Sequence, residues 1–326
     1  MTDQLVYALA AEGQLRCMAA VTTRLVEEAC RRHGTFPTAS AALGRALTGG
    51  LLMGAGSKDL EKITLQFHCD GPLGNIIVQA DPHGKVRGYV SNPAADSING
   101  NSRGKLDVRA IVGSGMLHVI RDAGFEIGLM KEPYRGMVPI VSGEIGEDIA
   151  YYLAKSEQIN SAVGLGVLVE FEDGTSEESL SSVEAALERL RVRAAGGFII
   201  QVMPSAEENL IAKVEQTIST APASTEMIAG GMTPAEMLRT LVGDLGLVTL
   251  EEKEPRFACQ CSSARARLII SALGRDEVED MLIRDGGAEL TCHFCNATYK
   301  ISADELKEIL KDETDVRCQS DSIADS

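Results

Sequence analysis

Two short cysteine pairs near the end of the sequence constrain the fold of this chain more than any other feature. The stretch FACQCSS contains Cys259 and Cys261, and the stretch LTCHFCN contains Cys292 and Cys295, with residues 262–291 between the pairs. In a reducing compartment, paired cysteines are metal ligands or redox groups more often than structural disulfides. The chain must therefore bring two separate stretches together if the pairs act as one site.

Four thiolates complete a tetrahedral zinc site, and short pairs from distant segments are a common way to build one. We therefore expect one zinc ion on four ligands: Cys259, Cys261, Cys292 and Cys295. The neighbouring His293 could replace a cysteine, but we expect it to face solvent because four sulfurs suffice. On the cysteines alone, a static structural zinc site is the favoured interpretation.

The stretch that carries the cysteines is too short to build much of a core, so zinc would supply a large part of its folding free energy. Structural zinc sites contribute about 10–16 kcal/mol. The thiols can also oxidise in pairs, and because a disulfide sulfur is a poor zinc ligand, oxidation and zinc release are linked. Four cysteines allow three pairings, and the spacing does not prove any of them, although sequence neighbours can pair with little rearrangement.

The composition excludes several classes of partner. The formal net charge is −16, there is no tryptophan, and aromatic residues make up 4% of the chain. Phosphate backbones and anionic membranes attract basic surfaces, and nucleic-acid bases stack on aromatic side chains, so we expect neither nucleic acid nor membrane as a partner. The N-terminal stretch lacks the pattern of a signal peptide, and no apolar run is long enough to span a membrane, so we expect a cytoplasmic protein.

Residues 1–204 have the pattern of a mixed α/β core with antiparallel sheets. Small apolar residues fill 39–53, which predicts a buried helix. Apolar and polar residues alternate over 63–90, with turns at DGPLG and DPHGK, which predicts a meander of strands. Two further buried strands are expected at 163–171 and 197–203.

Residues 205–256 change in character and predict a helical linker. Apolar stripes recur at helical spacing around Leu210 and again around Leu241. A helix with such a stripe is stable only when the stripe is covered, so we expect this linker to pack on another surface.

Residues 257–326 form a small cysteine-bearing module. Its second cysteine pair is expected at the turn of a hairpin, and Ser302 with Glu305 has the spacing of a capping box that opens a last helix. The tail QSDSIADS is expected to be disordered. The predicted fold class is therefore α+β: a mixed core, a helical linker and a small C-terminal zinc-binding module.

Several segments together identify a family. FACQC and GAELTCHFCNATY carry the cysteine spacing, PYRGMVPIVSGEIGEDIAYYLAKSEQINSAV covers 133–163, and AAGGFIIQVMP covers 194–204. With the earlier LQFHCDGPLGNIIVQADPHGKVRGYV, they occur in one order over nearly the whole chain. In this respect the sequence resembles the 33-kilodalton heat-shock protein family of redox-regulated bacterial chaperones.

The resemblance implies an ATP-independent holdase and no enzymatic activity. In the reduced form, zinc on Cys259, Cys261, Cys292 and Cys295 accompanies an inactive state. Oxidation with partial unfolding converts the pairs to disulfides, expels zinc, loosens the linker and favours an active homodimer. The implied partners are unfolded or partly folded client proteins, which pass later to ATP-dependent refolding chaperones.

Two features depart from the family pattern. The acidic, serine-rich stretch 172–182 is longer than the usual loop, and we expect a mobile surface insertion there. Cys318 in the tail is an additional cysteine, expected to be an exposed and inert thiol.

Two other function classes stay open. A thiol–disulfide oxidoreductase could use Cys292 and Cys295, although its motif belongs on a strand-to-helix turn rather than in a hairpin. A zinc-dependent interaction module is the other alternative. Cys17, Cys30 and Cys69 lie on apolar faces and are expected to be structural.

Overall fold

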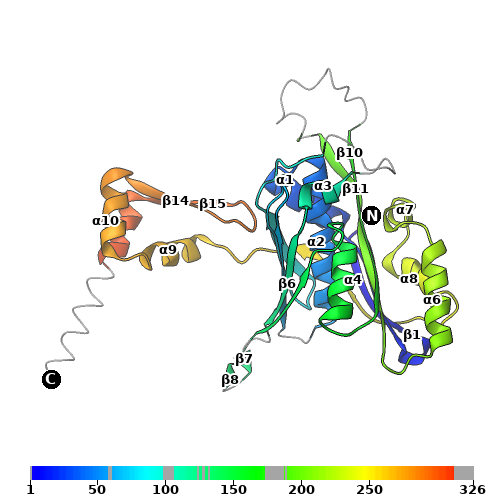
Figure 1. The fold of residues 1–326 in the computed structure, drawn as a ribbon. Coiled ribbons are helices and arrows are strands. Elements are labelled where there is room, and N and C mark those ends of the chain that lie inside the picture. The colour runs from blue at the N-terminus through cyan, green and yellow to red at the C-terminus, as the bar shows by residue number, and fades with distance from the viewer. Residues whose placement is uncertain are drawn as a thin grey trace. The chain divides into compact units, whose positions relative to one another are not determined.

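The computed structural model describes residues 2–57, 61–97, 106–122, 125–126, 129–130, 133–172, 187 and 189–311. The chain forms two compact units, Met1–Ala258 and Cys259–Ser326 (Figure 1). Within the described residues, no helix combines the length and the apolar character needed to cross a membrane. The acidic insertion expected at 172–182 falls, beyond Glu172, outside the described residues, as do Cys318 and the tail.

One five-stranded antiparallel sheet of the first unit has the order β10-β11-β2-β1-β12. Its strands are β1 (Gln4–Ala10), β2 (Leu15–Val21), β10 (Ser161–Phe171), β11 (Leu190–Val202) and β12 (Val248–Lys253). The strands β10 and β11 confirm that the two apolar runs form strands. As expected, β11 is largely buried, whereas β10 is mostly half-buried because it lies at the edge of the sheet. A short 3-10 turn, η1 (Ala11–Gly13), joins β1 to β2.

A second sheet has six strands in the order β13-β5-β4-β3-β6-β9. Its strands are β3 (Lys62–Cys69), β4 (Ile76–Ala80), β5 (Lys85–Val90), β6 (Gly115–Asp122), β9 (Tyr134–Pro139) and β13 (Arg256–Phe257). The strands β3, β4 and β5 pair antiparallel in sequence order, which confirms the predicted meander. A separate two-residue ladder joins β7 (Phe125–Glu126) to β8 (Leu129–Met130).

The helix α2 (Pro37–Ala55) is the layer between these sheets, and it packs against strands of both. Almost every residue from Thr38 to Ala55 is buried, as the run of small apolar residues predicts. Glycine permits the close approach: a Cβ at Gly50 would lie 2.7 Å from Cγ1 of Val78 on β4. The other helices around this core are α1 (Thr23–His33), α3 (Val108–Val112) and α4 (Gly146–Lys155).

A buried carboxylate fixes the segment between β9 and α4. Asp148 is 0% exposed and accepts backbone N–H bonds from Val141 and Ser142 at 2.8 Å and from Ile145 at 3.0 Å. Ile145 has a φ of 69°, an unfavourable region for a β-branched residue. The carboxylate therefore holds a turn that the chain would not adopt on local preference.

Three helices follow β11 and cover the outer face of the five-stranded sheet. They are α6 (Glu208–Thr220), α7 (Ser224–Ala229) and α8 (Pro234–Val242). Their apolar side chains, including Val214, Met227 and Leu241, share one buried cluster with alternate residues of β1, β2 and β11. Figure 1 shows these helices on the side of β10 and β11 that faces away from α2. The apolar stripes seen in the sequence are thus covered.

The predicted helical stretch does not stay helical to its end. Residues Val248–Lys253 form β12, which pairs antiparallel with β1, for instance Leu5 with Lys253. The physical reason is local sequence and an available edge: Val248 and Thr249 are β-branched and favour strand, and β1 offers an unpaired side.

The second unit contains two short helices, a β-hairpin and a last helical segment. Its elements are α9 (Ser263–Ser271), α10 (Arg275–Arg284), β14 (Gly287–Thr291) and β15 (Thr298–Ser302), with helical residues at 303–311. The predicted capping box is present, because Glu305 donates its backbone N–H to Ser302 Oγ and its carboxylate accepts the Ser302 N–H. Six buried side chains form the core: Ala266, Ile270, Val278, Ile301, Leu306 and Ile309. A core of this size gives little stability by itself.

Candidate metal centre

The two cysteine pairs lie in two turns of the second unit. Cys259 and Cys261 precede α9, whose first turn is capped because Ser262 Oγ accepts the backbone N–H of Arg265 at 3.2 Å. Cys292 and Cys295 lie in the connection between β14 and β15, so the hairpin expected from the sequence is present. Each pair is therefore anchored by a regular element that follows or flanks it.

The hairpin turn is held by backbone hydrogen bonds around Cys292. Its N–H donates to the carbonyl of Ala297 at 2.9 Å, and its carbonyl accepts from Cys295 at 3.3 Å and from Asn296 at 2.7 Å. Asn296 has a φ of 57°, the left-handed conformation that asparagine tolerates. This turn directs both thiols of the second pair to one side.

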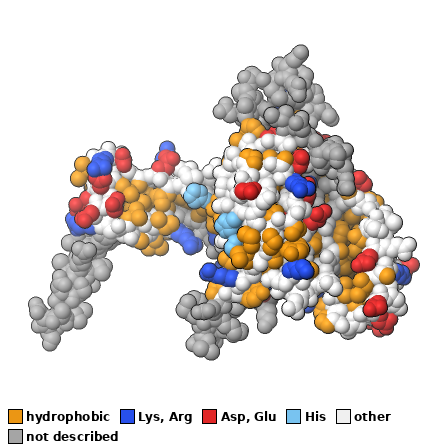
Figure 2. Space-filling view, viewed as in Figure 1, with side chains coloured by type: hydrophobic (Ala, Val, Ile, Leu, Met, Phe, Trp, Pro, Cys, Tyr) orange, Lys and Arg blue, Asp and Glu red, His pale blue; other side chains and the backbone are white. Residues whose placement is uncertain are grey.

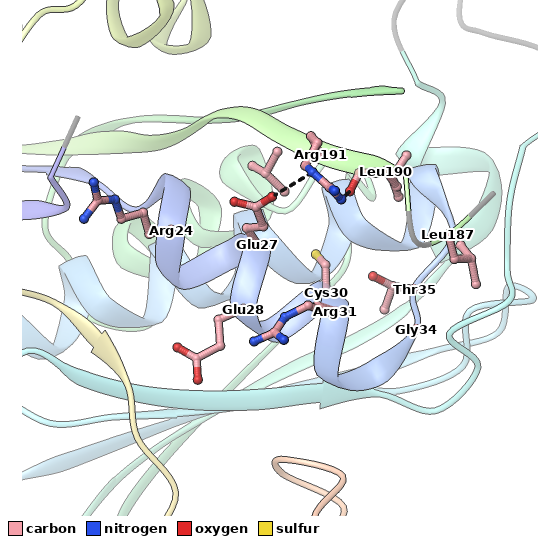
Figure 3. A pocket seen from close by; sticks show the side chains of 11 residues that line it. Arg24, Glu27, Glu28, Cys30, Arg31, Gly34, Thr35, Leu187, Leu190 and Arg191 are labelled. Carbon is pink, nitrogen blue, oxygen red and sulfur yellow. Dashed lines mark hydrogen bonds and ion pairs between the residues drawn. The ribbon is translucent and has the colours of Figure 1, made fainter. Parts of the chain in front are cut away.

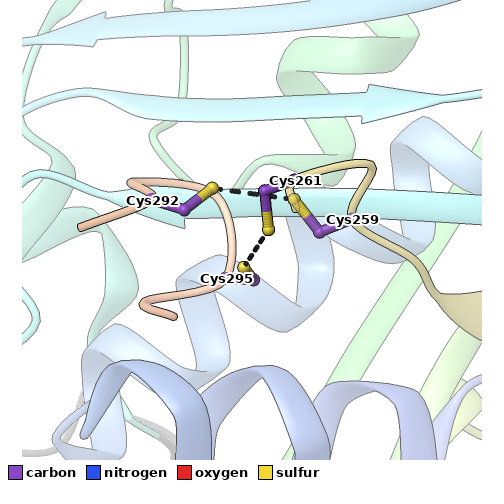
Figure 4. Close-up of side chains that lie close together, drawn as sticks. All are labelled: Cys259, Cys261, Cys292 and Cys295. Atoms are coloured by element: carbon purple, nitrogen blue, oxygen red, sulfur yellow. Dashed lines mark hydrogen bonds between the residues drawn. The ribbon is translucent and has the colours of Figure 1, made fainter. Parts of the chain in front are cut away.

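The four sulfurs converge. Sγ of Cys259 lies 3.6 Å from Sγ of Cys292, and Sγ of Cys261 lies 3.2 Å from Sγ of Cys295 (Figure 4). All four Sγ atoms lie within 4.8 Å of one another. Tetrahedral zinc with Zn–S bonds of about 2.3 Å places its sulfurs about 3.8 Å apart. The four side chains therefore fit a metal ion of this kind.

Burial favours the protonated form of two of these thiols. Desolvation raises the pKa of both Cys292 and Cys295 above the ordinary value. Four thiolates at such short distances also repel one another. A bound cation would remove both penalties, since metal ligation requires the deprotonated sulfur.

The sequence interpretation missed Tyr299, which lies on β15. Its hydroxyl donates a hydrogen bond to Sγ of Cys261 at 3.0 Å. This hydrogen bond is the main cause that raises the pKa of Tyr299 to about 12, so the hydroxyl keeps its proton at neutral pH. The only sequence signal was its place a few residues after Cys295 in a hairpin strand.

The other predicted residues lie apart from this cluster. His293 does not belong to the group of converging ligand atoms found among the described residues. Cys17 is 0% exposed and Cys30 is 7% exposed, as expected for structural cysteines. Cys69 is half-buried, and burial raises its pKa to about 12, as it does for Cys17.

The geometry argues against a thioredoxin-like use of Cys292 and Cys295. Such a site needs a nucleophilic thiol whose pKa is lowered at a helix N-terminus. Here both thiols lie in a hairpin turn, and burial raises their pKa.

A cavity of about 430 Å³ lies in the first unit between α1 and the start of β11 (Figure 3). Arg191, which lines the cavity, pairs with the lining residue Glu27 at 3.9 Å and with Glu172, which does not line it, at 2.7 Å. Its one thiol, Cys30, is buried, and desolvation raises its pKa. Compensated charges and an inert thiol give this cavity no catalytic arrangement.

Comparisons with known proteins cover nearly the whole chain. The family model described as Hsp33 protein matches residues 3–302. A 33 kDa chaperonin of Geobacillus sp. (strain WCH70) is 45% identical over 310 residues, which is 95% of this chain and 97% of that protein. One of Listeria innocua serovar 6a is 45% identical over 314 residues, 96% and 99% of the two chains.

A solved structure gives the same match in three dimensions. The crystal structure of the 33 kDa chaperonin (heat shock protein 33 homolog) of Thermotoga maritima has a TM-score of 0.81 and 32% sequence identity. The match covers 97% of this chain and 100% of that chain. Both the core and the cysteine-bearing unit are therefore included.

Proposed function

The chain belongs to the Hsp33 family, and from this premise we propose that it is a redox-regulated, ATP-independent holdase chaperone of the cytoplasm. Its partners would be unfolded or partly folded proteins, which it protects from aggregation and passes to ATP-dependent refolding chaperones. The observation that carries the redox part is the convergence of four cysteine sulfurs within 4.8 Å.

In the reduced form, we propose that Cys259, Cys261, Cys292 and Cys295 hold one Zn²⁺ per chain. The ion would supply positive charge and a cross-link between the turn before α9 and the β14–β15 hairpin. Tyr299 supports this state, because its hydroxyl donates to the Cys261 sulfur and so stabilises the thiolate. With the ion bound, the small second unit is folded and the protein is inactive.

Oxidation removes the ligands. Two thiols give two protons and two electrons to one hydrogen peroxide molecule, which becomes two water molecules, and one disulfide forms. Two such reactions use all four cysteines. Because disulfide sulfurs hold Zn²⁺ poorly, the site no longer binds the ion, and the second unit loses much of its folding free energy.

The pairing of the disulfides decides whether the unit opens. Two short sulfur distances run between the pairs, from Cys259 to Cys292 at 3.6 Å and from Cys261 to Cys295 at 3.2 Å. Disulfides formed that way would link the two turns covalently and keep the unit closed. We therefore propose the bonds Cys259–Cys261 and Cys292–Cys295, which leave the two turns free to separate.

Opening is proposed to spread to the linker, residues 205–256. The chain runs from β12, paired with β1, through β13, paired with β5, directly to Cys259. Release of these strands and of α6–α8 would uncover the apolar face of the five-stranded sheet, a surface suited to unfolded chains and to a homodimer.

Light scattering tests this function. A chemically unfolded client is diluted into buffer with reduced, zinc-loaded protein or with protein oxidised by hydrogen peroxide at mildly elevated temperature. Suppression of aggregation by the oxidised form alone, reversed by a thiol reductant, supports the proposal. Equal suppression by both forms indicates a chaperone with a static zinc site. Failure of both forms favours the zinc-dependent interaction module.

A further inference from the structure

The six-stranded sheet has an outer face that α2 does not cover. Side chains alternate along its strands, and Leu65, Phe67 and Leu117 point to the α2 side, where each is 0% exposed. The residues between them on β3 and β6 point outward. Figure 1 shows β6 in front of α2, and Figure 2 shows histidine atoms beside apolar side chains on this part of the surface.

Two histidines on this outer face are in contact. His68 lies on β3 and His118 on the neighbouring strand β6, where the register pairs His68 with Met116 and Gln66 with His118. The two histidines are thus diagonal neighbours on one face. Their ring centroids are 4.9 Å apart, and their ring planes are inclined by 88°.

The rings meet edge to face, and the distance between their centroids is compatible with two imidazole ligands of one metal ion. An ion about 2.0–2.1 Å from one nitrogen of each ring, with a bond angle between about 90° and 110°, places the ring centroids about 4.5–5.2 Å apart. The observed distance of 4.9 Å falls inside this interval. We propose that His68 and His118 form a second metal site, for a divalent transition-metal ion of the zinc type that prefers imidazole nitrogen.

The surroundings suit a ligand role. Neither ring makes a hydrogen bond to a protein group within the described part of the chain, so nitrogen lone pairs are available. Both histidines lie inside eight-residue strands that pair along their full length, which fixes their backbone positions. His68 is exposed, so water can complete the coordination of the ion.

The site differs from the cysteine cluster in place and in chemistry. His68 and His118 belong to the unit Met1–Ala258, whereas the four cysteines belong to the other unit. Imidazole ligands form no disulfides, so peroxide does not remove them. Two imidazoles also bind an ion more weakly than four thiolates, which predicts two classes of bound zinc in one chain.

Zinc titration of the full-length, reduced protein tests the proposal. Protein that already carries one equivalent of Zn²⁺ is titrated calorimetrically with more Zn²⁺. Excess Mg²⁺ is present to occupy surface carboxylates, because this hard ion binds carboxylate oxygen better than imidazole nitrogen. A second equivalent should bind. The imidazole Cε1–H resonances of His68 and His118 should shift, while those of the other three of the five histidines should not.

The matched variants are His68→Asn with His118→Asn, and His83→Asn as the control. The double variant should bind the second equivalent at least about tenfold more weakly, with an unchanged circular dichroism spectrum. His83→Asn should bind like the original protein. Binding that persists in the double variant would assign the second equivalent to carboxylates and overturn the proposal, as would the lack of a second equivalent in the original protein.

Discussion

The hydroxyl of Tyr299 donates a hydrogen bond to Sγ of Cys261 at 3.0 Å. This contact joins β15 to the turn before α9. A donor aimed at a metal-ligating sulfur stabilises the thiolate and fixes its direction. Tyr299 is therefore a supporting residue of the proposed zinc site rather than a ligand.

Replacing Tyr299 with Phe should weaken zinc binding by about tenfold to a hundredfold, because the thiolate loses its hydrogen bond while the ring is kept. Zinc release by hydrogen peroxide should also become faster. Competition with a chromophoric chelator measures both quantities. Tyr151→Phe on α4, in the other unit, is the control and should leave zinc affinity unchanged. An unchanged affinity in Tyr299→Phe would mean that the hydroxyl does not support the metal.

Replacing Cys261 or Cys292 with Ser should weaken zinc binding and make residues 257–300 sensitive to protease, because three sulfurs hold Zn²⁺ less well than four. Limited proteolysis with mass spectrometry locates the cleavage sites, and chelator competition gives the affinity. Cys69→Ala should behave like the original protein in both assays. Full zinc affinity in both serine variants would exclude these cysteines as ligands.

The part of the site that short sequence motifs define could be predicted from the sequence. The spacing of Cys259, Cys261, Cys292 and Cys295 predicts that their sulfurs lie together, because short cysteine pairs from distant segments are a common way to build a four-sulfur metal site. The buried helix α2 was predictable for a similar reason: a long run of small apolar residues has few alternatives to burial. In both cases the information is local.

Features that depend on the register of distant segments were not predictable. The contact of His68 with His118 requires β3 to pair with β6, which lies well beyond it in the chain. The strand β12 requires the free edge of β1, and its sequence LEEK continues the polar pattern of a surface helix. Tyr299 supports Cys261 only because the hairpin and the turn before α9 pack together.

Replacing Asp148 with Asn should destabilise the first unit by about 2–3 kcal/mol, because hydrogen bonds to a buried charge are lost. An amide must also turn its NH₂ group toward backbone N–H donors such as those of Ser142 and Ile145. Urea unfolding followed by circular dichroism measures the change. Glu147→Gln, next to it on the exposed side of α4, should stay within about 0.5 kcal/mol. Equal unfolding midpoints in the two variants would contradict the role given to Asp148.

Oxidised protein should contain the disulfides Cys259–Cys261 and Cys292–Cys295. Peptide mapping without reduction distinguishes them, because these bonds stay within one peptide when the chain is cut between residues 262 and 291. Crossed bonds would instead join two peptides. If crossed bonds dominate and the client is still protected, opening of the second unit is not needed for activity.

Oxidation should expose the linker to trypsin at Lys213 on α6 and Arg239 on α8. Both side chains are exposed in the folded helices, but a protease needs an unfolded backbone, so cleavage reports opening rather than access. Faster cleavage at both sites after peroxide, reversed by a thiol reductant, is the expected result. Arg45 on the buried helix α2 is the internal control and should be cut equally slowly in both forms. Equal rates at Lys213 and Arg239 before and after oxidation would mean that the metal centre and the linker are not coupled, since the helices would then stay on the sheet whatever happens to the four cysteines.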